Sequence, residues 1–113
     1  MKLVELAYFT DDVNKMANFY HHLLGVEPVA RSENMAIFMA DDTKIMIHRS
    51  YEPKSKDLPP YNHMAFAVED VDAACQKLEE LGLTLEVAPR DYYWGRSAYL
   101  RDPDGHQIEL IKS

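Results

Sequence analysis

Two carboxylates in this 113-residue chain stand where apolar side chains are expected. Glu5 lies within the run LVELAYF, and Glu109 lies within the run QIELI near the end of the chain. Side chains alternate between the faces of a strand, so Glu5 shares a face with Ala7 and Phe9. A carboxylate that faces an apolar interior is costly unless it is paired, hydrogen-bonded or bound to a metal ion. The two glutamates therefore mark a candidate functional site, or else they lie on a solvated face of a sheet.

An aromatic run precedes Gly95 and consists of Tyr92, Tyr93 and Trp94. Such rings form either a wall for a planar or hydrophobic ligand or an interface between subunits. Arg96 follows the run directly. Its guanidinium could bind a carboxylate or phosphate of a ligand in the same pocket, or it could be solvated on the surface of a sheet.

The elements that would position these residues occur twice along the chain. Residues 5–25 align with residues 63–82 at an offset of 58. Residues 41–50 align with residues 104–113 at an offset of 63, because the loop region around residues 88–95 is longer in the second half. The matching order of elements in the two halves indicates an internal repeat.

Each half is predicted to contain one strand, one helix and three further strands, which is the order βαβββ. Apolar residues recur at helical spacing in residues 13–24 and again in residues 71–81, with acids before each helix and a glycine after it. The short strands that follow the helices are predicted at residues 26–32, 34–40, 43–49, 84–89, 95–101 and 106–112. The pattern predicts one α+β domain, with module one at residues 1–50, a polar linker at residues 51–61 and module two at residues 62–113.

Composition and charge exclude several kinds of partner. The chain is 47% hydrophobic and 27% charged, which is typical of a soluble globular protein, and its apolar runs are far shorter than the ~20 residues that span a membrane. Twelve basic against 19 acidic residues give a net charge of −7, so neither nucleic acid nor an anionic membrane is an expected partner. The single cysteine, Cys75, falls on the apolar side of the second helix, which favours a core role in a reduced, cytoplasmic protein.

Three motifs carry a family resemblance: DVNKMANFY in the first helix, NHMAFAVEDV at the start of the second half, and the closing DPDGHQIEL. With them the chain resembles the vicinal oxygen chelate superfamily. That group includes glyoxalase I, extradiol dioxygenases, methylmalonyl-CoA epimerase, fosfomycin-modifying enzymes and bleomycin-binding resistance proteins. The resemblance covers essentially the whole chain. It implies two βαβββ modules whose strands form a curled mixed sheet around a cleft for a metal ion or a ligand.

The resemblance also implies which residues would hold a divalent ion, since the family's ligands come from the first and last strands of each module. Those positions map onto Glu5, Met46, His63 and Glu109. His63 and Glu109 keep the family's residue types, whereas Glu5 stands where the family usually has His and Met46 where glyoxalase I has Glu. The Met46 thioether is soft and neutral, so we assign it to the substrate pocket. His48 is either a substitute ligand or a residue of the cleft wall.

Glu5, His63 and Glu109 would make a site with one imidazole and two carboxylates. Oxygen-rich ligands favour Mn, Fe or Mg, and the imidazole leaves Zn, Ni and Co open. Glu5 and Glu109 are then the candidate catalytic residues, and Glu5 would serve as a general base if no metal binds there. A bound ion would act as a Lewis acid toward a substrate that chelates through adjacent oxygens.

Two functions remain open at this point. The first is a metal-dependent enzyme of lyase, isomerase, transferase or dioxygenase type that acts on a small oxygen-chelating substrate. The second is a metal-free small-molecule-binding protein of the bleomycin-resistance type, which the aromatic run and the departures at Glu5 and Met46 favour. A weaker third option, a ferredoxin-like regulatory module, requires only one or two strands after each helix. We expect a homodimer because open sheets of this size leave edges that need covering, and exchanged modules would make the site a shared one.

Overall fold

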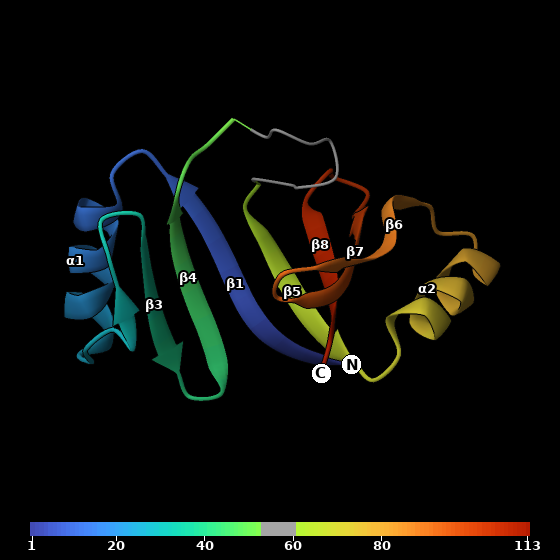
Figure 1. Cartoon of the computed structure of the whole chain (residues 1–113), viewed down its shortest axis with the longest axis horizontal. Coiled ribbons are helices and arrows are strands. Elements are labelled where there is room, and N and C mark those ends of the chain that lie inside the picture. The colour runs from blue at the N-terminus through green and yellow to red at the C-terminus, as the bar shows by residue number, and fades with distance from the viewer. Residues whose placement is uncertain (53–60) are drawn as a thin grey trace. The chain divides into compact units, whose positions relative to one another are not determined.

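The internal repeat is present as two copies of one element order (Figure 1). The computed structural model describes residues 1–52 and 61–113, so most of the predicted linker, residues 53–60, lies outside the described residues. The first copy comprises β1 (Lys2–Thr10), α1 (Val13–Leu24), β2 (Ala30–Arg31), β3 (Met35–Ala40) and β4 (Thr43–Arg49). The second comprises β5 (His63–Val68), α2 (Val71–Glu80), β6 (Leu85–Tyr92), β7 (Gly95–Arg101) and β8 (Gln107–Lys112).

The predicted α+β class and the βαβββ order are confirmed. Three strands follow each helix, so the ferredoxin-like alternative is wrong. The chain divides into two units, one formed by Glu5–Asn62 and the other by Met1–Val4 together with His63–Ser113. Neither helix in the described part of the chain has the length and apolar character needed to cross a membrane.

Both helices begin at an aspartate that caps the first turn. The side chain of Asp12 accepts a hydrogen bond from the backbone of Lys15, and the side chain of Asp70 accepts one from the backbone of Ala73. These bonds satisfy backbone N–H groups that have no partner inside the helix. The first helix ends at Gly25, whose φ of 69° is a left-handed conformation that glycine adopts without strain.

In the unit Glu5–Asn62 the strands lie in the order β2-β3-β4-β1. Strand β4 runs parallel to β1 and antiparallel to β3, which in turn pairs with β2. Alternate residues of β3 and β4 point toward α1 and form a buried core with its apolar stripe. The core residues are Val13, Ala17, Ala36, Phe38, Ile45 and Ile47.

The unit with His63–Ser113 repeats this arrangement in the order β5-β8-β7-β6. Strand β8 runs parallel to β5 and antiparallel to β7, and β7 pairs with β6. Its core, beside α2, consists of Val71, Cys75, Ala98, Leu100 and Leu110. Cys75 is 2% exposed and burial raises the pKa of its thiol, which confirms the predicted core role.

Two strands differ in length from the predictions. The strand predicted at residues 26–32 is present only as Ala30–Arg31. Pro28 has no N–H and cannot donate a hydrogen bond to a neighbouring strand. Just before β2, the backbone N–H of Val29 donates to the carbonyl oxygen of Ile37 on β3. In contrast, β6 extends to Tyr92, beyond the predicted end at residue 89, with irregular pairing along its length. Tyr92 therefore belongs to a strand and not to a loop.

Candidate functional site

His63 and Glu109 lie in direct contact in the interior of one unit. The Nε2 atom of His63 is 3.0 Å from an Oε1 atom of Glu109. Their side chains are only 6% and 5% exposed. A buried carboxylate needs such a partner, because water no longer stabilises its charge.

The sheet register brings these two side chains together. Strands β5 and β8 are parallel neighbours, with Ala65 opposite Glu109 and His63 opposite Gln107. Leu110 packs in the core beside α2, so Glu109, one residue earlier, points to the opposite face of the sheet. We call that face, which also carries His63, Ser97, Tyr99 and Gln107, the site face.

The second oxygen of Glu109 is held by a short chain of hydrogen bonds. The Ser97 hydroxyl donates to Oε2 of Glu109 at 2.7 Å. The indole N–H of Trp94 donates to the same Ser97 hydroxyl at 3.0 Å. An indole N–H can only donate and a hydroxyl has one proton. The hydrogen bonds therefore run from Trp94 to Ser97 and from Ser97 to Glu109. The chain fixes the orientation of the carboxylate toward His63.

Aromatic rings line the site face beside this chain. The rings of Tyr92 and Trp94 are stacked, with centroids 4.4 Å apart and an interplanar angle of 4°. Tyr99 meets Tyr92 edge to face at 6.1 Å and His63 edge to face at 5.9 Å. Tyr93 is 95% exposed and contacts Trp94 from outside. Two rings of the aromatic run thus join the surroundings of His63, while the third remains on the surface.

Ser97, Tyr99 and Gln107 were not assigned to the site from the sequence. Ser97 is 0% exposed and Gln107 is 1% exposed, and both are polar. The available signal was strand alternation, because Gln107 is two residues from Glu109 and so shares its face. No such signal exists in the sequence for Ser97. This residue is on β7, and it lies near Glu109 of β8 only because of the antiparallel register between the two strands.

Arg96 lies on the other face of the same sheet, toward α2. Its guanidinium donates to both carboxylate oxygens of Asp72 at 2.6 and 2.9 Å, and to Asp91 at 3.0 Å. The structure therefore does not bring Arg96 together with His63 and Glu109. The bond to Arg96 holds the pKa of Asp72 below its ordinary value of 3.8.

This pair predicts a pH-dependent contribution to stability. A carboxyl whose pKa is lower in the folded state stabilises the fold above its unfolded-state pKa, and the contribution is lost as the pH falls through the folded-state pKa. Asp72→Asn is neutral at all pH values, so we expect a lower urea midpoint than wild type at about pH 7 and a difference that shrinks as the pH falls below 3.8. Asp104→Asn, at an exposed turn, is the matched control. An Asp72→Asn deficit that stays constant over the whole acid range would show that charge is not its cause.

The remaining predicted residues belong to the unit Glu5–Asn62. In the parallel register Glu5 lies opposite Lys44 and Ala7 lies opposite Met46. Because Ile45 and Ile47 pack toward α1, Glu5 and Met46 point to the face of that sheet away from the helix. Their roles at the site remain predictions.

His48 shares that face and packs among aromatic rings. Its ring centroid is 5.7 Å from that of Phe9 and 5.7 Å from that of Tyr51. Its Nδ1 atom is 2.8 Å from the carbonyl oxygen of Arg49, which can only accept, so Nδ1 carries a proton. The neutral ring then presents Nε2 as its acceptor, which is the form in which histidine binds a metal ion. This geometry leaves both predicted roles of His48 open.

The contact between His63 and Glu109 fits two ligands of one divalent ion. The two atoms are at hydrogen-bond distance, 3.0 Å, and an imidazole nitrogen and a carboxylate oxygen are both groups that would bind a divalent ion. Ser97 donates a hydrogen bond to the other oxygen of Glu109 and is itself held by Trp94, so the carboxylate keeps one orientation. Among the described residues of this unit, no third His, Cys, Asp or Glu side chain completes a metal site.

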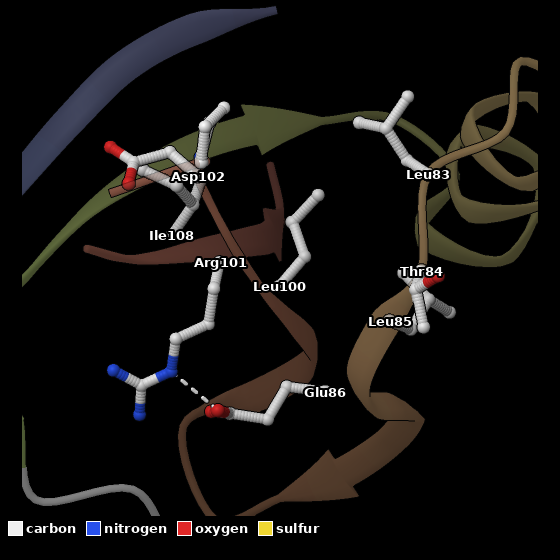
Figure 2. Close-up of a pocket in the computed structure, with 9 residues that line it drawn as sticks. Leu83, Thr84, Leu85, Glu86, Leu100, Arg101, Asp102 and Ile108 are labelled. Atoms are coloured by element: carbon white, nitrogen blue, oxygen red, sulfur yellow. Dashed lines mark hydrogen bonds and ion pairs between the residues drawn. The ribbon is translucent and has the colours of Figure 1, made fainter. Parts of the chain in front are cut away.

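A cavity of about 790 Å³ lies elsewhere in the same unit. Its apolar lining includes Leu85, Leu100 and Ile108, which also contribute to the core beside α2 (Figure 2). Neither His63 nor Glu109 lines it. The cavity is therefore separate from the His63–Glu109 contact, although one of its lining residues, Glu86, accepts a hydrogen bond from Gln107 of the site face.

Comparison with known proteins agrees with the α+β fold described above. The family model of the glyoxalase/bleomycin resistance protein/dioxygenase superfamily matches residues 2–110. The chain belongs to this superfamily. Within the superfamily it is 34% identical to the glutathione transferase FosA of Serratia marcescens, over 96% of this chain and 78% of that protein.

Other relatives support the same assignment. The chain is 29% identical to the metallothiol transferase FosB of Staphylococcus saprophyticus, over 93% of this chain and 72% of that protein. A solved structure of a superfamily member from Vibrio splendidus 12B01 matches with a TM-score of 0.69 and 17% identity, and the match covers 99% of this chain and 98% of that one. That structural likeness shows the fold.

Proposed function

We propose that this glyoxalase-superfamily protein is a metal-dependent enzyme that acts on a small oxygen-chelating molecule. His63 and Glu109 would hold the divalent ion, and Glu5 is the proposed third ligand. The observation that carries the proposal is the buried 3.0 Å contact between His63 Nε2 and Glu109 Oε1. When bound, the ion would supply Lewis-acid polarisation of a substrate oxygen.

The protein's own residues would prepare that site. Ser97 and Trp94 hold the Glu109 carboxylate in one orientation, so little ordering is required when a ligand binds. Tyr99 packs edge to face against His63 and limits how far the imidazole can rotate. The low exposure of the pair excludes water, which strengthens electrostatic interactions with a bound substrate.

Among the reaction types considered, transfer of a thiol is the one that the relatives favour. The names of the two relatives above are glutathione transferase and metallothiol transferase. We propose a transferase of this class, with Mn, Fe, Zn, Ni, Co or Mg as candidate ions. We also propose that it works as a homodimer in the reducing cytoplasm, where thiol substrates are abundant; a monomer at micromolar concentration in light scattering would contradict the dimer.

A thiol-consumption assay tests the proposed activity. Chelator-stripped protein is mixed with glutathione and a panel of epoxides, and free thiol is followed against a protein-free blank after each metal is added back. We expect thiol loss that depends on one or two of the metals and that is absent with Glu109→Gln. Thiol loss that is unaffected by chelator, or no loss with any metal, would contradict a metal-dependent thiol transferase.

A second candidate is a metal-free binding protein for an aromatic ligand. The stacked pair Tyr92 and Trp94 favours it, because such a pair presents a flat apolar surface beside the site. This candidate predicts that an aromatic ligand raises the melting temperature equally with and without chelator. Binding that requires a metal ion would exclude it.

A further inference from the structure

The two oxygens of the Glu109 carboxylate have different partners. Its Oε1 atom lies 3.0 Å from Nε2 of His63. Its Oε2 atom accepts a hydrogen bond from the Ser97 hydroxyl at 2.7 Å. Glu109 is only 4% exposed, so water contributes little at either oxygen. The two oxygens of a carboxylate in water are equivalent, whereas here one oxygen faces an imidazole and the other is held by a serine.

The Ser97 hydroxyl is itself fixed by its neighbours. Ser97 is 0% exposed, and the indole N–H of Trp94 donates to its oxygen at 3.0 Å. Because the indole occupies an acceptor position of the hydroxyl, the single hydroxyl proton remains directed at Oε2 of Glu109. The ring of Trp94 stacks on Tyr92 with centroids 4.4 Å apart, which holds the indole in place. The donor at Oε2 is therefore a constant feature of the folded chain.

A donor held at Oε2 favours the binding of an ion through Oε1 alone. A carboxylate binds a divalent ion either with one oxygen or with both. Binding with both oxygens would make Oε2 share its electron density between the ion and the Ser97 proton, which weakens both interactions. Binding through Oε1 keeps the hydrogen bond from Ser97 intact. Oε1 is also the oxygen that already lies beside the other proposed ligand atom, Nε2 of His63.

We propose that Ser97, held by Trp94, is a positioning residue that makes Glu109 a one-oxygen ligand of the divalent ion. Each protein oxygen that stays off the ion leaves a coordination position for another ligand. A substrate that chelates through two adjacent oxygens needs two such positions, so Ser97 keeps the ion open to the proposed substrate class. This inference rests on the proposed function, because it assumes that His63 and Glu109 hold an ion.

Infrared difference spectra measure how many oxygens of Glu109 bind the ion. The antisymmetric and symmetric stretches of a carboxylate lie further apart when one oxygen binds an ion than when both do. Spectra are recorded with and without saturating Mn(II) on protein that carries isotopically labelled glutamate, and the bands of Glu109 are those that Glu109→Gln removes. We expect a wide separation in wild type and a narrower one in Ser97→Ala, whose affinity for Mn(II) in calorimetry should also fall about 10–100-fold. Ser32→Ala, which alters an exposed serine, is the matched control and should behave as wild type.

A second variant provides the test if Ser97→Ala does not fold. Trp94→Phe keeps a ring beside Tyr92 and removes the N–H that holds Ser97, so it should change both readouts in the same direction by a smaller amount.

Three results would overturn the role of Ser97 and leave the proposed function intact, provided that Mn(II) binding to wild type requires Glu109. They are a wild-type separation typical of two bound oxygens, a separation that is the same in wild type and Ser97→Ala, and a weaker affinity with no change in separation. The last result would mean that Ser97 only supports the fold. If neither Mn(II) nor any other candidate ion binds wild type, the proposed metal site fails and the inference fails with it.

Discussion

Glu109→Gln is expected to weaken the binding of a divalent ion by at least about 100-fold while the fold persists. Loss of a residue that only orients a ligand costs about 10–100-fold in metal affinity, and loss of the ligand's own charge should cost more. Glutamine has nearly the same shape, but its amide replaces one of the two carboxylate oxygens that face His63 and Ser97. The variant therefore removes charge and one acceptor without opening a cavity.

Thermal melting of chelator-stripped protein measures this effect. An ion present at about 100 times its dissociation constant adds roughly 2.7 kcal/mol to the stability of the wild type, which gives a clear rise in melting temperature. We expect that rise to be absent with Glu109→Gln and unchanged with Glu79→Gln, which alters an exposed glutamate on α2. An equal rise in wild type and Glu109→Gln would show that the ion binds elsewhere.

Phe38→Ala is expected to reduce the free energy of unfolding by about 3–5 kcal/mol. Phe38 lies on β3 and is 0% exposed, within the core that the sheet forms with α1. Truncation removes its buried apolar surface and leaves a cavity among neighbours, including Ile45 and Ile47, that are themselves held in strands and cannot close it fully. Urea unfolding followed by circular dichroism gives the difference from the wild type.

Phe19→Ala is the matched control for that measurement. Phe19 is 59% exposed on α1 and has the same side chain. Its loss should cost less than about 1 kcal/mol, because little of its surface leaves water on folding. Similar losses for Phe19→Ala and Phe38→Ala would contradict the described core.

The repeat and the faces of the strands could be predicted from the sequence because they depend on local patterns. Helical spacing located both helices, and the acids at Asp12 and Asp70 marked their first turns. Alternation along β8 distinguished Glu109 from its apolar neighbours, and its burial explains why that position looked anomalous. What the patterns could not show was how far β2 and β6 extend, since strand length depends on pairing between distant segments.

The partners within the site depend on register and therefore escaped prediction. Ser97 reaches Glu109 only because β7 pairs antiparallel with β8 at one particular register. Strand β7 begins at Gly95, so Arg96 points to the same face of the sheet as Leu100. On that face, beside α2, Arg96 binds Asp72. Where a strand has no clear alternation of apolar and polar residues, the face of a side chain is known only after the strand has been aligned with the neighbouring strands.

Titration of chelator-stripped protein with Mn(II), followed by calorimetry and by the electron paramagnetic resonance signal of the free ion, tests the central claim most directly. We expect one ion per chain for wild type, a loss of binding with His63→Asn, and wild-type binding with His106→Asn, which changes an exposed histidine at the β7–β8 turn. Binding that is equal in all three proteins, or absent from wild type with Mn(II) and with the other candidate ions, would contradict a metal site at His63 and Glu109.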